Sequence, residues 1–288
     1  MNWRIAPKTR LLCYDARVTP HVDDPRGTSV QPSVEPPVGP PHLSIDGPVA
    51  RIVLRRPEQH NAIEAHDVAR LHAHLATVES ASDVRVLVLT GSGRATFCSG
   101  ASLVQIESGE LTGSMFERLA DALASVRVPT VCALNGSAFG GGVELAVCCD
   151  FRVGVDGSRI AVPAAKLGIC YPVGGIRRFV SALGPGPAAR LLIAAEEIDA
   201  DGMLAAGFLH RRVPPDRLAA ATDELAARLA SLAPLAVQAM KRILREVAAG
   251  SLDAAAAEAL VARAARSEDF REGVRARREG RDPVFRGA

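Results

Sequence analysis

The sequence predicts an α/β fold that is followed by a helical region at the carboxyl end. Two short runs are apolar along almost their whole length, which is typical of strands buried on both faces, and a third run is a predicted short strand. They read "VRVLVLTG" (84–91), "PTVCALNG" (129–136) and "FRVGV" (151–155). Helical patterns separate them, and strands that alternate with helices predict right-handed β-α-β crossovers. Beyond Gly175 the pattern is almost wholly helical.

By composition, the 288 residues divide into three parts. Residues 1–42 include "TSVQPSVEPPVGPP", whose Pro, Ser and Gly content predicts a disordered extension that builds no core. Residues 43–215 hold the alternating strands and helices. Residues 216–288 form the helical carboxyl region, and a helical tail of this kind is expected to serve subunit contacts.

The first ordered element is a predicted hairpin. The stretch "HLSIDGPVARIVLRRP" (42–57) places two strands around a turn at Asp46-Gly47, and Pro57 ends the second strand. A helix follows, in which four apolar residues recur at helical spacing. They are Val68, Leu71, Leu75 and Val78. The histidines of this helix are expected to be surface residues, and we predict no metal site.

The next elements alternate up to the middle of the chain. After the strand at 84–91 we predict a helix around 115–124, then the strand at 129–136. A glycine turn leads into a helix within "GGGVELAVCCD" (140–150), and the strand at 151–155 follows. This order is the basis of the predicted α/β fold.

The composition excludes several classes of function. A formal net charge of +2 favours no polyanionic partner, and 4% aromatic residues are too few for a base-stacking nucleic-acid surface. We find no apolar run long enough to span a membrane. The six cysteines contain no C-x-x-C pair, which favours reduced thiols in a cytoplasmic protein.

Two glycine-containing segments carry the expected chemistry. "TFCSGASL" (96–103) and "NGSAFGGGVEL" (135–145) both follow buried strands, and their small residues let backbone N–H groups approach a ligand. A helix that starts near Gly141 has unpaired N–H groups and a dipole that favours negative charge. One N–H group from each segment would make an oxyanion hole, worth about 3–4 kcal/mol per donor. Glu144 falls in the first helical turn and would face the same pocket as a base.

The glycine run alone fits a second interpretation, a tight turn or close helix packing without a ligand. The rest of the chain favours the catalytic interpretation, because several motifs resemble one family in the same order. "RRPEQHNAI" (55–63) resembles R-P-x-x-x-N-A, and "FCSGASL" (97–103) resembles F-x-x-G-x-D-L. "VPTVCALNGSAFGGGVELAVCCD" (128–150) resembles P-x-x-A-x-x-N-G-x-A-x-G-G-G-x-E-L-A-x-x-C-D. "APLAVQAMK" (233–241) and "SEDFREGVRARREGRDPVF" (267–285) resemble carboxyl-terminal segments of the crotonase superfamily, the enoyl-CoA hydratase/isomerase family.

The resemblance, which covers 43–285, implies a spiral of β-β-α turns with a helical carboxyl region that forms a trimer or a dimer of trimers. It implies an acyl-CoA thioester as substrate, with no cofactor besides the coenzyme A that is part of it. The amides of Ala101 and Gly141 would hold the thioester oxygen, and Glu144 matches the first of two hydratase glutamates. A further group would lie along the coenzyme A path: Asn61, Ala62, Ser99, Ser102 and Leu103.

The chain departs from the family pattern at three positions. Ala164 stands where the second hydratase glutamate is expected, and an alanine transfers no proton. Ser102 replaces the usual aspartate, which affects the bracing of the loop rather than the amide of Ala101. Tyr171 matches a tyrosine of methylmalonyl-CoA decarboxylase-like members, where a hydroxyl orients a carboxylate or protonates an enolate. A packing role for Tyr171 at a loop–helix junction is equally consistent with the sequence.

Three functions remain open from the sequence. The first is an enoyl-CoA hydratase-like lyase in which Glu144 is the only acid/base and Tyr171 assists. The second is a decarboxylase of a short malonyl-type CoA ester, where loss of CO2 creates the enolate without a second glutamate. The third is a binding protein that keeps the acyl-CoA pocket without turnover.

Overall fold

The structure, a computed structural model, describes residues 38–288. The predicted extension over 1–42 therefore lies almost entirely outside the described residues. The first strand, β1, begins at Gly39, before the expected start of order at Leu43.

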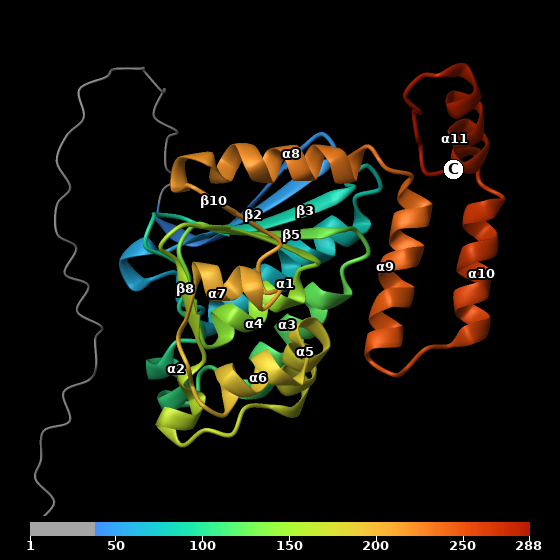
Figure 1. Ribbon diagram of the computed structural model, residues 1–288. Helices are drawn as coiled ribbons and strands as arrows, with labels where there is room; N and C mark the ends of the chain where they lie inside the picture. Colours follow the sequence, from blue (N-terminus) through green and yellow to red (C-terminus); the bar gives the residue numbers. More distant parts are fainter. Residues whose placement is uncertain (1–37) are drawn as a thin grey trace, which may run out of the picture. The chain divides into compact units, whose positions relative to one another are not determined.

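A six-stranded sheet forms the centre of the fold (Figure 1). Its strands run in the order β1-β2-β3-β5-β7-β10, and only β1 pairs antiparallel to its neighbour. The strands are β1 (Gly39–Asp46), β2 (Val49–Arg55), β3 (Val86–Gly91), β5 (Thr130–Leu134), β7 (Phe151–Val155) and β10 (Arg211–Val213). The predicted hairpin, the two predicted buried strands and the predicted short strand at 151–155 are thus confirmed.

A second sheet of four short strands was not predicted from the sequence. It runs in the order β4-β6-β8-β9, and the strands are β4 (Thr96–Cys98), β6 (Ser137–Phe139), β8 (Arg159–Ala161) and β9 (Ile198–Asp199). Because β3, β5 and β7 are each followed by a strand of this second sheet, each turn of the chain contributes one strand to each sheet. The chain therefore forms the expected spiral of strand–strand–helix turns.

Helices cover both faces of the large sheet (Figure 1). On one face lie α1 (Ala65–Ser80), α3 (Gly113–Ser125) and α4 (Gly141–Cys148), whose apolar side chains share one core with Ile52, Leu89 and Leu134. On the other face, α8 (Leu218–Ala230) packs on Val88, Val131 and Val153. The central strands β3 and β5 therefore bury alternate residues in different cores, which explains their apolar character on both sides.

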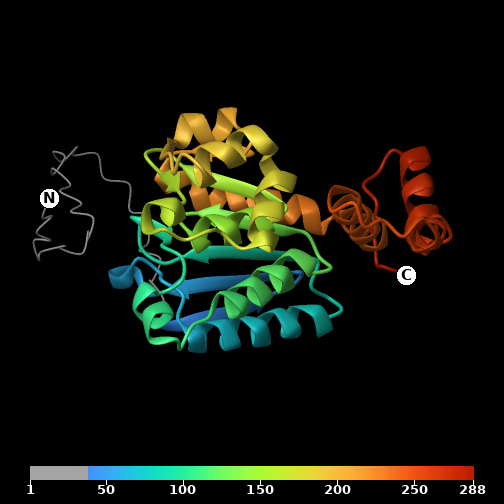
Figure 2. The ribbon, with the colours of Figure 1, turned by 90° about the horizontal axis from the view of Figure 1, so that it is seen from below.

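The remaining helices lie around this centre. They are α2 (Leu103–Ser108), α5 (Val173–Leu183), α6 (Pro185–Leu192), α7 (Ala200–Ala205), α9 (Pro234–Ala248), α10 (Ala254–Ala265) and α11 (Glu268–Glu279). In both ribbon views α9, α10 and α11 stand to one side of the sheets (Figures 1 and 2). The sequence placed α8 with these helices in 216–288, whereas in the structure α8 packs on the sheet.

The described cysteines are free thiols, as expected, and all but Cys170 are buried. Burial is the main cause that raises the pKa of Cys98 to about 12, so this thiol stays protonated. Across residues 38–288 no helix combines the length and the apolar character that crossing a membrane requires.

Candidate active site

A cavity of about 260 Å³ lies among the segments that follow β4, β6 and β8 and the residues that precede α5. We call it the Glu144 pocket, and most of its exposed lining is apolar. Apolar residues of the lining include Leu103, Ile106, Leu111, Phe116, Leu167 and Ile169. Its polar residues are few, which is the usual composition of a small-molecule site.

Two backbone amides line the pocket without an acceptor. They belong to Ala101, in the segment after β4, and to Gly141, the first residue of α4. Among the described residues, neither N–H group donates a hydrogen bond, although the neighbours of Ala101 are held in place. Ile63 N donates to Gly100 O at 2.8 Å and Ser102 N donates to Ile63 O at 2.8 Å. Two unpaired donors at one cavity can therefore bind an oxygen atom of a ligand.

Glycine brings the two segments together. Gly100 has φ +94°, and a Cβ atom on it would lie 2.7 Å from Gly141 N. A Cβ atom on Gly142 would lie 2.1 Å from Cys98 O. The segment after β4 and the start of α4 thus approach each other more closely than side chains allow, which explains the glycines in the motif.

Glu144 is buried at the edge of the pocket, and its carboxylate is held from two sides. Arg178 of α5 donates from Nε (3.0 Å) and Nη2 (2.6 Å) to Oε1. The hydroxyl of Tyr171 donates to Oε2 at 2.7 Å. Arg178 also pairs with Asp121 of α3, so one guanidinium joins two carboxylates.

The hydroxyl of Tyr171 is protonated at neutral pH. Burial, followed by the negative charge of Glu144 and the hydrogen bond to it, raises the pKa of Tyr171 well above its usual value. The ring packs edge-to-face on Phe179, with centroids 5.6 Å apart. Tyr171 therefore both packs at the loop–helix junction and contacts the expected base, which joins the two roles that the sequence left open.

Ala164 lies in the lining, within the short 3-10 helix Pro163–Leu167. The position expected to hold a second glutamate therefore does face the pocket without a carboxylate. The lining nevertheless includes a second acid, Glu117 of α3, which the sequence analysis missed. Arg178 was missed as well, because neither residue is near Glu144 in the sequence and only the packing of α3 and α5 against α4 brings them together.

The residues expected along the coenzyme A path fall into two groups. Ser99 and Leu103 line the pocket, whereas Asn61, Ala62 and Ser102 lie outside the lining that the described residues form. Asn61 is buried, and its side-chain amide donates to Ser92 O (3.0 Å) and Thr96 O (2.9 Å). Its side chain therefore braces the segments around β4. Ser102 precedes α2 as its N-cap residue.

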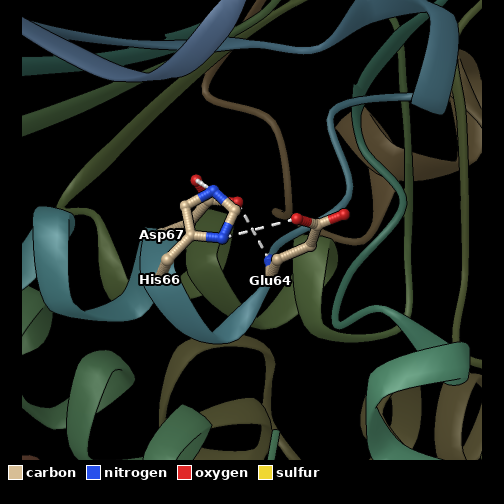
Figure 3. A group of neighbouring side chains, drawn as sticks. All are labelled: Glu64, His66 and Asp67. Carbon is tan, nitrogen blue, oxygen red and sulfur yellow. Dashed lines mark hydrogen bonds and ion pairs between the residues drawn. The ribbon is translucent and has the colours of Figure 1, made fainter. Parts of the chain in front are cut away.

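A second polar cluster lies at the start of α1, where Glu64 and Asp67 accompany His66 (Figure 3). The histidines of this helix were expected at the surface, and His66 is exposed, with these two carboxylates beside it. Glu64 N donates to Asp67 Oδ2 at 3.0 Å, and Arg56 pairs with both Asp67 and His66. We assign the cluster to capping of α1, because its charges are already compensated by an arginine.

Comparison with known proteins agrees with this geometry. The family model described as enoyl-CoA hydratase/isomerase matches residues 44–288. The chain belongs to the enoyl-CoA hydratase/isomerase family. This places it in the crotonase superfamily and confirms the resemblance drawn from its motifs.

Relatives and solved structures of this family cover most of the chain. A short-chain-enoyl-CoA hydratase of Clostridium acetobutylicum is 30% identical over 75% of this chain and 84% of its own length. A carnitinyl-CoA dehydratase of Citrobacter koseri is 33% identical over 85% of this chain and 98% of its own. The crystal structure of an enoyl-CoA hydratase from Bacillus anthracis superposes with a TM-score of 0.80 at 26% identity, covering 87% of this chain and 100% of its own. The crotonase-type α/β fold is thereby confirmed.

Proposed function

We propose that this member of the family is an enoyl-CoA hydratase-like lyase that works through an enolate. The observation that carries the proposal is the arrangement of the Glu144 pocket. The unpaired amides of Ala101 and Gly141 line the same apolar cavity as the carboxylate of Glu144. An acyl-CoA thioester needs this combination, because its oxygen gains negative charge while a proton is moved nearby.

The reaction follows from these groups. Water adds its oxygen to the β-carbon of the enoyl group, and Glu144 takes a proton from that water. The electron pair of the C=C bond moves toward the thioester oxygen, where the amides of Ala101 and Gly141 stabilise the enolate. A proton that enters from solvent is delivered to the α-carbon and completes the 3-hydroxyacyl-CoA, and Glu144 returns its own proton to solvent. Tyr171 orients Glu144 through its hydrogen bond to Oε2.

A second candidate, a decarboxylase of a malonyl-type CoA ester, is favoured by the contact between Tyr171 and Glu144. Loss of CO2 would leave the same enolate on the same two amides. The protonated hydroxyl of Tyr171 would then lie beside the carbon that is to be protonated. In the third candidate function, the pocket binds an acyl-CoA ester but catalyses no reaction.

One experiment separates the three. Purified protein is incubated with crotonyl-CoA and, separately, with methylmalonyl-CoA, each in parallel with Glu144→Gln. We expect hydration of crotonyl-CoA that falls by a factor of about 100 or more in Glu144→Gln. Hydration that survives this substitution contradicts the role of Glu144. Release of CO2 from methylmalonyl-CoA supports the second candidate, and tight binding of both esters without turnover supports the third.

We further propose a homotrimer, or a dimer of trimers, located in the cytoplasm. The helix α9 supports the first part, because it exposes Met240, Leu244 and Val247 along one side. Residues at these spacings share a helical face, and such a stripe is typical of a subunit contact. The free thiols of the described residues are in keeping with the cytoplasm.

A further inference from the structure

We propose that Glu117 is a second acid/base residue of the Glu144 pocket and carries the proton at the α-carbon of the acyl group. The inference rests on the proposed acyl-CoA chemistry and adds a residue to it. In this arrangement α3 supplies the carboxylate that position 164 lacks.

Glu117 reaches the pocket from α3 and is held by the start of α5. Its Oε1 accepts a hydrogen bond from Gly174 N at 3.1 Å. Gly174 lies in the first turn of α5, where unpaired N–H groups and the helix dipole favour negative charge. Within residues 38–288, no hydrogen bond engages the other oxygen, Oε2. Glu117 is therefore a fixed carboxylate with one oxygen available to a ligand.

The two carboxylates approach the same short segment of α5. A Cβ atom on Gly174 would lie 2.2 Å from Glu117 Oε1, and one on Gly175 would lie 3.2 Å from Glu144 Oε1. Consecutive Cα atoms are about 3.8 Å apart, so these contacts place both acids within the reach of one small substrate. A side chain at 174 would therefore move the carboxylate of Glu117 from this position.

The two acids differ in the number of hydrogen bonds that each carboxylate accepts. Glu144 already accepts three hydrogen bonds, from Arg178 and Tyr171, whereas Glu117 accepts one. Glu117 therefore keeps more acceptor positions free for a ligand, and we assign to it the proton at carbon. Both line the same pocket as Ala101 and Gly141, whose amides would stabilise the enolate as it forms.

In the direction of dehydration the step balances as follows. The α-C–H bond of a 3-hydroxyacyl-CoA breaks, its proton moves to Glu117, and its electron pair forms the enolate. The enolate then expels the β-hydroxyl group, which leaves as water with a proton from Glu144 in its carboxylic acid form. Glu117 has gained one proton and Glu144 has lost one, so exchange with solvent water restores both.

Glu117 could instead have a purely structural role, the capping of α5. Two substitutions distinguish this role from the acid/base role. Glu117→Gln keeps an oxygen acceptor for Gly174 N but loses the base, whereas Glu117→Ala loses both. We expect Glu117→Gln to lower kcat for crotonyl-CoA hydration about 100-fold, with an unfolding temperature within about 2 °C of the wild type. Glu110→Gln, an exposed acid outside the pocket lining, is the matched control and should leave both values unchanged.

A second measurement keeps this inference distinct from the hydratase proposal. The exchange of the α-hydrogens of butyryl-CoA for deuterium in D2O is followed by NMR. Because butyryl-CoA has no C=C bond to hydrate, this exchange reports only on proton abstraction and on stabilisation of the enolate. Exchange that is lost in Glu117→Gln supports the assignment, even where wild-type protein hydrates nothing and the hydratase proposal fails. Wild-type rates of hydration and exchange in Glu117→Gln overturn it and leave Glu117 as a cap. A wild-type protein that binds butyryl-CoA without exchange overturns both proposals.

Discussion

Glu144 lies between a cation and a phenol, and this arrangement defines what the residue can do. Arg178 compensates the charge at Oε1, and Tyr171 contacts Oε2. A carboxylate oxygen has two lone pairs, so Oε2 can accept a further hydrogen bond from water. The carboxylate is thus held in one orientation by Arg178 and Tyr171, while one acceptor position of Oε2 remains for a ligand.

Tyr171→Phe tests the contribution of the phenol. The substitution removes the 2.7 Å hydrogen bond to Glu144 and keeps the ring that packs on Phe179. We expect kcat for hydration to fall about tenfold, which corresponds to about 1.4 kcal/mol in the activation free energy, with KM nearly unchanged. Steady-state kinetics with crotonyl-CoA measure both values. An unchanged kcat would mean that Tyr171 only packs.

The raised pKa of Tyr171 gives a pH dependence of stability. An unfolded tyrosine loses its proton near pH 10, whereas burial and the charge of Glu144 keep the folded one protonated to higher pH. Above about pH 10 the folded state therefore binds more protons than the unfolded state, and the free energy of unfolding falls as the pH rises. Urea unfolding between pH 8 and 11 should show a steeper loss in the wild type than in Tyr171→Phe. Equal slopes would contradict this contribution.

Removal of Arg178 should destabilise the protein, because it leaves Glu144 buried without its counter-charge. The side chains of Glu144 and Arg178 are only 5% and 13% exposed, so solvent replaces little of the lost interaction. We expect Arg178→Gln to lower the free energy of unfolding by about 3 kcal/mol, measured by urea denaturation. Asp121→Asn is the control, since this partner of Arg178 is 65% exposed and its loss should cost less than about 1 kcal/mol.

The sequence identified those candidate site residues that lie in local motifs. Ala101, Gly141 and Glu144 lie within two short motifs, and the structure brings them to one pocket. Glu117 and Arg178 have no local motif, since each belongs to an ordinary amphipathic helix and reaches the pocket only through packing. Asn61 is expected beside the ligand, and its positive φ of 53° and buried side-chain amide show that it also shapes its own loop.

At the scale of elements, long apolar strands and periodic helices were predictable, and short strands were not. β3, β5 and β7 are almost wholly buried, which gives each a continuous apolar run. β4, β6 and β8 have three residues each and lie inside glycine-containing or polar segments. A segment of three residues is too short to show the alternation of buried and exposed positions that indicates a strand. These three strands are therefore recognised only by their pairing within the second sheet.

Gly142 tests the close approach of α4 to β4. A Cβ atom there would meet Cys98 O, a backbone atom that cannot rotate away, so Gly142→Ala must push the start of α4 from the strand. We expect a loss of about 2 kcal/mol or more in the free energy of unfolding. Gly113→Ala, at the start of α3, is the control: its Cβ would meet nothing within 4 Å, and the change should be neutral or slightly stabilising. Equal thermal unfolding of the two variants would contradict the close contact.

At the scale of the whole molecule, the sheets and their covering helices form a self-contained core, whereas α9–α11 lie beside it (Figure 2). This separation explains why α9 buries only Ala239 within a helix of 15 residues. A helix that buries so little against its own chain has an apolar face available for another subunit. The tertiary core and the proposed assembly surface are therefore carried by different parts of the chain.

The proposed trimer is tested at the centre of this face. Leu244 lies on α9 with its side chain largely exposed, and Leu244→Asp would place a charge where a partner's apolar surface is expected. We expect the wild type to have the mass of a trimer or hexamer in size-exclusion chromatography with light scattering, and Leu244→Asp to have the mass of a monomer. Ile193→Asp, at an even more exposed apolar residue after α6, should keep the wild-type mass. A monomeric wild type, or a variant at Leu244 that still assembles, would contradict this surface.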